Sequence, residues 1–480
     1  MKKRYIVTLL AGCMLATSSC DEFLTEMPEN SYTLENAVTD YKTAQNSVNG
    51  IYGVYAKNSY LGGYLYGFTH CMAGIWDYAP DIVNMGYKQS NPNTFIDGIW
   101  KQWYSVINAS NAAIEGVSKL TDDKFPSSAE KERLIAEARC FRGYANLHLL
   151  WFYARWFDAP ESPYGIIYRT QTSELTNLML DRISVGDSYN VIIDDFKYAE
   201  EHLGDYTSSH YLSKQMAQVM HAKLLMVRGW DGDYAEALNL VNSVMTTAPA
   251  VFAMESDVTE LYDKAWDSKE LLFSRYMGDL TNLSYSEFIY SYGLYFNPTF
   301  TDIVQEWLEA DERYPYIVGD ARSPETWQDQ RKDNILIKLY HRGRYEGMDD
   351  KYTPYQFRYA ELYLMKAELL ARTNPSDLTA PLAELNKMRE TYTNPVLAPI
   401  TGITTHQQLM DAIYKEYVVT LLMENETPWF ASLRFEHDGK PWIRTLKPDV
   451  DFSENQYCWP IPDVEIIAHL NKIEQNPGLE

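Results

Sequence analysis

Residues 367–386 read AELLARTNPSDLTAPLAELN, and this stretch indicates the fold most directly. Its apolar residues recur at spacings of three and four, as on one face of a helix, and the turn signal at 374–376 divides it into two helices. Residues 222–239, AKLLMVRGWDGDYAEALN, repeat the pattern around a turn at 231–233, with two residues fewer at that turn. Small residues on both stretches would let paired helices approach closely. We therefore predict two similar helical hairpins.

Helical spacing also dominates the rest of the chain, whereas strand-like alternation is scarce. Helices are expected over residues 100–120, from Ser127 to about residue 157, and over 191–203. The second of these begins with capping-box spacing, Ser127 to Glu130. The hairpin pattern resembles degenerate tetratricopeptide pairs, which stack because one pair cannot bury its own apolar face, although two unrelated amphipathic helices could also look alike. The fold class predicted is all-α, with such helix pairs as its scaffold.

Residues 248–354 differ in composition from the rest of the chain: they are rich in Gly, Pro, Asn and Tyr, and their hydrophobic periodicity is weak. Loops of this length inside a compact protein are usually functional or disordered. The aromatic content argues against disorder, because disordered segments contain few aromatic residues. Long aromatic-rich loops are therefore expected here, and they are candidates for a ligand site.

The charge balance excludes some function classes. The chain has 480 residues, with 42 Lys+Arg against 66 Asp+Glu and a formal net charge of −24. Nucleic-acid binding and docking on anionic lipid both need clustered basic residues, which this balance disfavours. Aromatic residues make up 14% of the chain, including 38 Tyr. Tyr combines a flat apolar ring with a hydroxyl, which suits wet surfaces that bind polar ligands.

The N-terminus resembles a bacterial lipoprotein signal. A basic start at residues 1–4 is followed by a short apolar run and then by small residues that lead into Cys20. The run is shorter than the roughly 20 residues that a membrane span needs. We expect residues 1–19 to be removed and Cys20 to be lipidated; Cys13 is the alternative, but cleavage there would leave a very short apolar run.

The remaining cysteines, Cys71, Cys140 and Cys458, are scattered. Three isolated cysteines do not form a disulfide framework, and we expect them to be small buried hydrophobic residues. No ligand spacing typical of zinc is present, so neither a metal nor a cofactor is expected.

Motifs along the whole chain resemble those of one family. The C-terminal part contains YCWPIP at 457–462, EII at 465–467 and QNPG at 475–478. Further upstream lie RYAELYLM at 358–365 and the Leu-Asn-x-x-Arg run at 385–389. Two more stretches agree, AEARCFRGY with its aromatic continuation at 136–157 and CDEFL at 20–24. Taken in their order along the chain, these motifs resemble those of the SusD/RagB family. The sequence departs from the family pattern at 414–419 and 423–427, and the pattern resumes at 432–435.

The resemblance implies a specific role. Such proteins are surface lipoproteins of Bacteroidetes outer membranes that cover a SusC-like TonB-dependent transporter and capture nutrient, most often an oligosaccharide, for import. It implies a single SusD-like domain over residues 20–480, with a tetratricopeptide-like N-terminal half at 20–247 and a C-terminal half at 248–480. It also implies attachment at the cell surface through Cys20, and no catalysis.

Two loops combine aromatic rings with hydrogen-bonding side chains, as sugar binding requires. The first runs from residue 76 to residue 95, and the second lies in the long aromatic region, in the two places where the family commonly contacts its ligand. Any single ring among them could instead be a core residue. The candidate glycan-binding residues are Trp76, Asp77, Tyr78, Tyr87, Asn93, Phe95, Tyr292, Tyr295 and Trp327.

Catalytic motifs are hard to find. The sequence has no His-Glu-x-x-His, Gly-x-Ser-x-Gly or Cys-x-x-Cys motif and no phosphate-binding glycine loop. Adjacent acids at 194–195, 200–201 and 349–350 could supply a glycosidase pair, but solvated helix faces are the simpler interpretation. His148 and His221 fit packed helix positions. A peptide-capturing RagB-like protein is the alternative function, and a helical glycoside hydrolase is a distant third.

Overall fold

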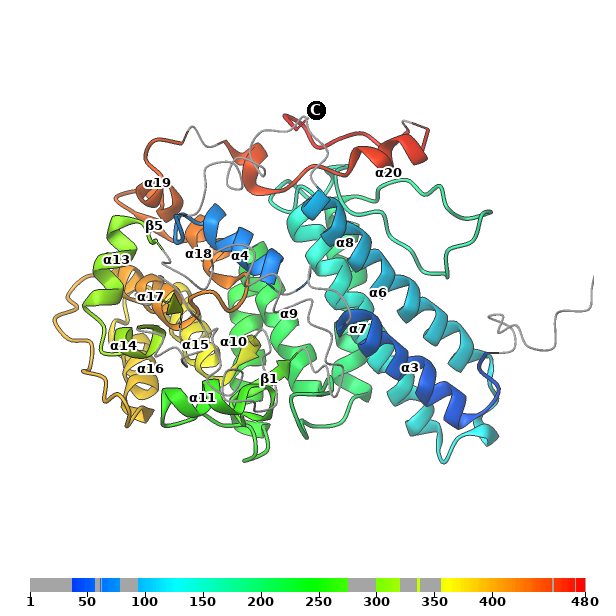
Figure 1. Ribbon diagram of the computed structural model, residues 1–480, viewed down its shortest axis with the longest axis horizontal. Helices are drawn as coiled ribbons and strands as arrows, with labels where there is room; N and C mark the ends of the chain where they lie inside the picture. Colours follow the sequence, from blue (N-terminus) through cyan, green and yellow to red (C-terminus); the bar gives the residue numbers. More distant parts are fainter. Residues whose placement is uncertain are drawn as a thin grey trace, which may run out of the picture.

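The computed structural model describes residues 37–56, 61, 63–77, 94–274, 299–319, 335–336, 355–450, 453–470 and 472–479. This part of the chain is mostly helical, as predicted (Figure 1). Its longer helices are α3 (Tyr41–Ala56), α4 (Gly63–Met72), α6 (Thr94–Lys119), α7 (Ser128–Tyr153), α8 (Val185–His202), α9 (Lys214–Arg228), α10 (Asp233–Thr247), α15 (Tyr359–Thr373), α16 (Thr379–Thr391) and α17 (His406–Thr420). Shorter helices are α11 (Val258–Lys264), α13 (Asp302–Glu309), α14 (Tyr314–Ile317), α18 (Thr427–Arg434), α19 (Trp442–Leu446) and α20 (Asp463–Ala468), with 3₁₀ turns at η2 (Asp122–Lys124), η3 (Ala265–Asp267) and η6 (Glu454–Tyr457).

The strands of the described chain form three two-stranded antiparallel sheets. They are β1 (Leu271–Ser274) with β4 (Tyr355–Arg358), β2 (Val318–Gly319) with β3 (Ile335–Leu336), and β5 (Glu436–His437) with β6 (Lys440–Pro441). Within residues 248–354, expected as loops, the structure forms α11, β1, α13, α14, β2 and β3, so the loop interpretation was wrong for those stretches. Their shortness explains why periodicity did not reveal them.

Four helices of the N-terminal half, α3, α6, α7 and α8, lie side by side (Figure 1). The Ser127 hydroxyl accepts a hydrogen bond from the Glu130 N–H at 3.2 Å, so α7 starts where the capping signal predicted. Its 26 residues span about 39 Å at 1.5 Å per residue. The helices expected at 100–120 and 191–203 are confirmed, but both begin about six residues earlier, at Thr94 and Val185.

Both helical hairpins form where the repeated pattern predicted them. One is α9 with α10 and the other is α15 with α16, and α10 packs against α15, so the two hairpins stack (Figure 1). Gly229 and Gly232 have positive φ angles of 64° and 85° in the first turn, which a glycine adopts without steric cost. That each hairpin is a tetratricopeptide unit stays a prediction.

The C-terminal WPIP and QNPG runs are hydrogen-bonded to each other and pack against the end of α7. Trp459, 1% exposed, stacks on Phe152 with ring centroids 4.8 Å apart. The side-chain amide of Gln475 donates to the Ile461 carbonyl at 2.8 Å and accepts from the Ile461 N–H at 2.9 Å. The Asn476 amide donates to the Tyr153 and Trp459 carbonyls at 3.0 and 3.1 Å. The WPIP and QNPG motifs therefore attach the C-terminal segment to the N-terminal half of the chain.

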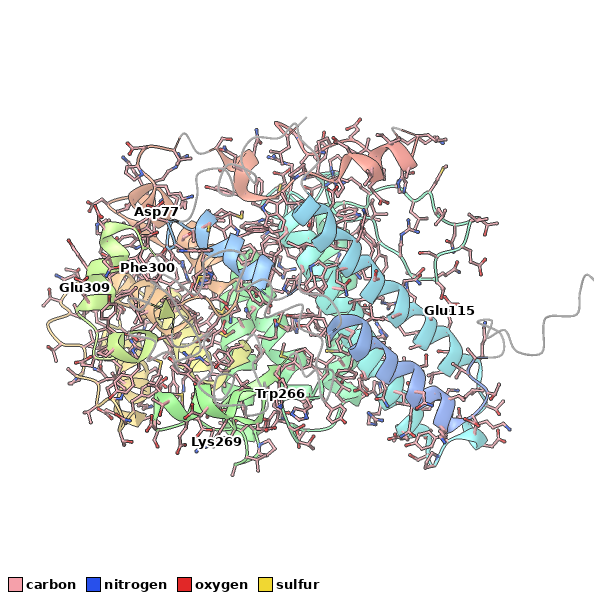
Figure 2. All side chains as sticks on the ribbon, viewed as in Figure 1. Asp77, Glu115, Trp266, Lys269, Phe300 and Glu309 are labelled. Atoms are coloured by element: carbon pink, nitrogen blue, oxygen red, sulfur yellow. The ribbon has the colours of Figure 1, made fainter. Side chains whose placement is uncertain are left out.

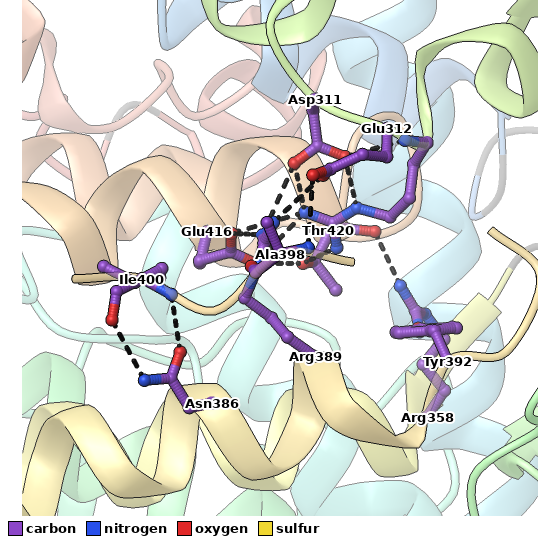
Figure 3. Close-up of polar contacts among 11 residues, drawn as sticks. Asp311, Glu312, Arg358, Asn386, Arg389, Tyr392, Ala398, Ile400, Glu416 and Thr420 are labelled. Atoms are coloured by element: carbon purple, nitrogen blue, oxygen red, sulfur yellow. Dashed lines mark hydrogen bonds and ion pairs between the residues drawn. The ribbon is translucent and has the colours of Figure 1, made fainter. Parts of the chain in front are cut away.

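Buried ion pairs hold the C-terminal helices together (Figure 3). Arg389, from the Leu-Asn-x-x-Arg run, donates to Glu416 on α17, which also accepts from Arg313 at 3.1 Å. Arg358, which begins the RYAELYLM motif, donates to Glu270 and Glu424 at 2.6 and 2.8 Å. All six side chains are less than 9% exposed. Buried charges need partners, and here the family-like motifs supply them.

Candidate ligand-binding site

Residues 76–77, which lead into residues 78–93, lie beside residues 299–300, which follow residues 275–298. Trp76 and Phe300 form an antiparallel β-bridge. The Asp77 N–H donates to the Thr299 carbonyl at 2.8 Å, and the Thr299 hydroxyl donates back to the Asp77 carbonyl at 2.6 Å. Figure 2 shows Asp77 and Phe300 close together on the same side of the molecule. The first expected ligand loop and part of the second therefore share one base, which we call the loop joint (residues 76–77 and 299–300).

The end of α4 positions the loop joint. The chain turns at Gly74, whose φ is +71°, and a Cβ there would lie 2.9 Å from the Leu446 Cβ, so both the conformation and the packing require glycine. The Trp76 N–H donates back to the His70 carbonyl at 3.2 Å. The Thr301 hydroxyl donates to the Gly74 carbonyl at 2.7 Å and ties the second segment to the same turn.

The His70 side chain connects α4 to the C-terminal half through hydrogen bonds. Its Nδ1 lies 2.8 Å from the Tyr66 carbonyl, and its Nε2 accepts the Met423 N–H at 2.8 Å. Because a carbonyl only accepts and an N–H only donates, this buried imidazole is neutral and carries its proton on Nδ1. The turn it holds is unusual, since Met423 has a φ of +57°. The imidazole thus couples the loop joint to the turn between α17 and α18.

The other long segments also begin and end at β contacts. The β1–β4 pair, in which Ser274 faces Tyr355, holds the start of residues 275–298 beside the end of residues 337–354. The β2–β3 pair, in which Gly319 faces Ile335, brings the ends of residues 320–334 together. Short sheets therefore fix the bases of the aromatic-rich segments.

The structure places two of the predicted ligand residues in full. Trp76 is 4% exposed and packs in the core, so its ring supports the loop joint and does not present an open stacking face. Asp77 is exposed at the same joint. Phe95 lies in the first turn of α6, but its side chain is outside the described structure. Also outside the described residues are Tyr78, Tyr87, Asn93, Tyr292, Tyr295, Trp327 and the lipidation candidate Cys20.

Lys447 is a charged residue near the loop joint that sequence reasoning did not select. Its Cγ lies 2.9 Å from where a Gly74 Cβ would be. Burial lowers the pKa of the Lys447 ammonium to about 8, and the nearby Cys71 and Asp77 oppose this shift. The buried Lys447 ammonium is therefore close enough to the Asp77 carboxylate for the two charges to interact. The only signal for it would have been its close approach to Gly74, which sequence spacing cannot reveal.

Potential catalytic groups are used in structural contacts. Asp195 is 1% exposed and accepts from Arg139 and Arg142 at 2.7 Å each, so its assignment to a solvated face was wrong; two guanidinium partners compensate its burial. His148 is buried and stacks on Trp103 with centroids 4.4 Å apart, as expected of a packed residue.

His221 is also buried, and its Nδ1 lies 2.9 Å from the Glu200 carboxylate. The free cysteines Cys71, Cys140 and Cys458 are buried, as predicted. Among the described residues, no group of three His, Cys, Asp or Glu side chains could hold a metal ion. None of the described helices is long and apolar enough to cross a membrane.

Comparison with known proteins agrees with the resemblance. Residues 22–224 match a family described as starch-binding and associating with the outer membrane, and residues 335–479 match the SusD family. The chain belongs to the SusD/RagB family. A SusD-like protein P2 from Formosa agariphila is 23% identical, with 99% of this chain and all of the relative aligned. A SusD-like protein from Bacteroides ovatus is 25% identical over 48% of this chain and 40% of the relative.

Solved SusD-like structures share the fold. A SusD superfamily protein from Bacteroides thetaiotaomicron superposes with a TM-score of 0.71 and 20% identity, covering 92% of this chain and all of that one. NanU from Bacteroides fragilis gives a TM-score of 0.70 with 15% identity over 95% of this chain and all of NanU. A laminarin-binding SusD-like protein gives 0.68 with 17% identity over 92% of this chain and all of that one. The SusD/RagB family is thus one of outer-membrane-associated carbohydrate-binding proteins.

Proposed function

We propose that this chain is a glycan-binding lipoprotein at the cell surface that captures an oligosaccharide and delivers it to a SusC-like TonB-dependent transporter, without catalysis. The observation that carries the proposal is the loop joint, because it gathers two aromatic-rich segments at one base in a chain of a carbohydrate-binding family. The laminarin-binding SusD-like protein shares its fold, which supports glycan as the ligand class.

The chemistry of the joint suits a sugar. Sugar hydroxyls need hydrogen-bond acceptors, and the exposed Asp77 carboxylate offers one at the loop joint. The apolar faces of a sugar would stack on rings of the attached segments. We therefore keep Asp77 as the first contact residue and propose ring or polar contacts from Tyr78, Tyr87, Asn93, Phe95, Tyr292, Tyr295 and Trp327. Trp76 is proposed to support these contacts from below.

The mature chain is proposed to begin at a lipidated Cys20 in the outer membrane and to form a single domain over residues 20–480. The described part starts at residue 37, so the 16 residues 21–36 separate it from Cys20. A chain of that length reaches at most about 60 Å when extended. It is long enough to keep the folded body clear of the bilayer while attached to it.

A ligand screen tests the proposal. A soluble form starting at Asp21 is titrated calorimetrically with a panel of polysaccharides and then with mixed peptides, and the products are analysed for new reducing ends. Saturable glycan binding without cleavage is the expected result. Binding of peptides alone would make the protein RagB-like in function, and new reducing ends would make it a hydrolase.

One variant links the screen to the loop joint. Asp77→Ala should weaken glycan binding by about tenfold, since a hydrogen bond to a charged group contributes about 1.5–3 kcal/mol. Asp231→Ala is the matched control, because Asp231 is also exposed but lies in the turn between α9 and α10. Equal affinity in the two variants would remove the loop joint from the ligand site.

A further inference from the structure

A small polar cavity lies where α7 meets the first helices of both hairpins. Its walls come from α7, α9, α15, α17 and α18, and its volume is about 10 Å³. Three of its lining side chains are buried and polar: Trp151 on α7, Lys223 on α9 and Glu361 on α15. A cavity of this size is just large enough for one water molecule. Its polar lining therefore raises the question of what it binds.

The indole of Trp151 supplies a hydrogen-bond donor to this cavity. The ring is 0% exposed and packs against Phe430, with ring centroids 4.8 Å apart. Within the described residues, its Nε1 atom has no hydrogen-bond acceptor. Buried N–H groups are nearly always hydrogen-bonded, because leaving one unpaired after removing it from water is destabilising. The Trp151 N–H therefore needs an acceptor that the surrounding side chains do not provide.

The ammonium of Lys223 supplies a second donor. Its Nζ donates to the Glu426 carboxylate at 2.7 Å and lies 3.4 Å from the Glu361 carboxylate. These two carboxylates are its partners among the described residues. An ammonium carries three N–H groups, so one of them remains for another acceptor. Lys223 is 5% exposed, and bulk water is therefore not available to fill that role.

Glu361 supplies the acceptor on the other side of the cavity. Its carboxylate accepts from the Thr427 hydroxyl at 2.6 Å and from the Asn425 amide at 2.8 Å. A carboxylate has about four lone-pair sites, so these two bonds and the Lys223 ion pair leave room for one more donor. A molecule in the cavity can thus accept from Trp151 and Lys223 and donate to Glu361.

Charge and hydrogen-bonding capacity select among possible occupants. A metal cation would face the Lys223 ammonium and the Trp151 N–H, which both repel positive charge. A chloride ion would accept from both donors, but it would lie beside the Glu361 and Glu426 carboxylates. An apolar occupant would leave the Trp151 N–H unpaired. Water fits the volume and both accepts and donates.

We infer that this cavity binds one structural water molecule, which accepts hydrogen bonds from Trp151 and Lys223 and donates one to Glu361. The water connects α7 of the N-terminal half with α9 and α15, one helix of each hairpin. It is part of the packing between these helices, because buried waters that satisfy polar groups are costly to remove. The inference is independent of the ligand that the loop joint binds.

A high-resolution crystal structure of the full chain tests the inference. One electron-density peak is expected within hydrogen-bond distance of the Trp151 Nε1, the Lys223 Nζ and the Glu361 carboxylate. A second crystal is soaked in sodium bromide, because bromide replaces bound chloride and gives an anomalous signal. The peak should carry no such signal. An anomalous peak would make the cavity an anion site, and the lack of any peak would show that it binds no water; either result would overturn the inference.

Two variants form a matched pair for the Trp151 contact. Trp151→Phe and Trp103→Phe each remove one indole N–H and keep an aromatic ring. Trp103 is also 0% exposed, and its N–H likewise has no acceptor within the described residues, but Trp103 does not line this cavity. In crystals of the Trp151 variant the peak should be lost or displaced toward Lys223, whereas the Trp103 variant should keep it in place. A peak that stays in place in both variants, or is displaced in both, would refute Trp151 as a partner of the water. The structure of the natural chain decides the inference if the Trp151 variant does not fold.

Discussion

Trp76 and Asp77 are neighbours in the chain, but their side chains have opposite surroundings. The Trp76 ring is 4% exposed within the core, while Asp77 is exposed at the loop joint. This follows from the extended backbone of the β-bridge to Phe300, where successive side chains point to opposite faces. The indole therefore anchors the joint, and the carboxylate is the group that can meet a ligand.

Replacing Trp76 should mainly lower stability. Trp76→Ala removes a buried aromatic ring, so we expect the free energy of unfolding to fall by about 3–5 kcal/mol. Trp76→Phe should keep most of that stability, because an aromatic ring still fills the site. Chemical denaturation of both variants measures the difference. An alanine variant as stable as the natural protein would show that the ring is not part of the core.

At the scale of elements, a buried glutamate joins α15 to α18. Glu368 accepts from Arg434 at 2.8 Å with both carboxylate oxygens and from Arg372 at 2.8 Å. Burial alone would raise the pKa of the Glu368 carboxyl, but the two guanidinium groups lower this pKa to about 2. A folded-state pKa below the ordinary value of 4.5 contributes stability that is present above about pH 4.5 and is lost as the pH falls toward 2.

Glu368→Gln should therefore change how stability depends on pH. At pH 7 the variant should be less stable by about 3 kcal/mol, which is the order of magnitude of the pKa shift. Toward pH 2–3 the difference should shrink, because the natural carboxylate is then becoming protonated. Urea denaturation of both proteins at several pH values measures this. A difference that stays constant with pH would show that the carboxylate charge is not the source of the stability.

Much of this element level was predictable from the sequence. The hairpins at 222–239 and 367–386 follow from local spacing and turn residues, which act over a few positions. The loop joint could not be predicted, because Trp76 and Phe300 are far apart in the chain and pair through backbone atoms that carry no sequence signal. The same holds for Lys447, whose relevance depends on its contact with Gly74. Motif resemblance predicted the regions of the site but not these contacts.

At the scale of the whole molecule, the end of the chain closes onto the N-terminal half. Asn476 connects three places at once, since its amide donates to Tyr153 at the end of α7 and to Trp459, and its oxygen accepts from Arg182 at 2.8 Å. Trp459 in turn donates from its indole to the Met72 sulfur at the end of α4. The same segment includes α20, so these contacts hold α20 near the ends of α7 and α4.

Asn476→Ala should loosen these contacts. The side chain is fully buried, and its removal leaves the Tyr153 and Trp459 carbonyls without the amide donor, which costs about 1–3 kcal/mol. We expect hydrogen exchange to accelerate at the C-terminal end of α7 and in α20, while the α15–α16 hairpin exchanges as before. Asn239→Ala, at an exposed position on α10, is the control and should change neither region. Unchanged exchange in α7 and α20 of the Asn476 variant would show that the C-terminal segment is held against α7 by other contacts, with Trp459 stacked on Phe152 as the next candidate.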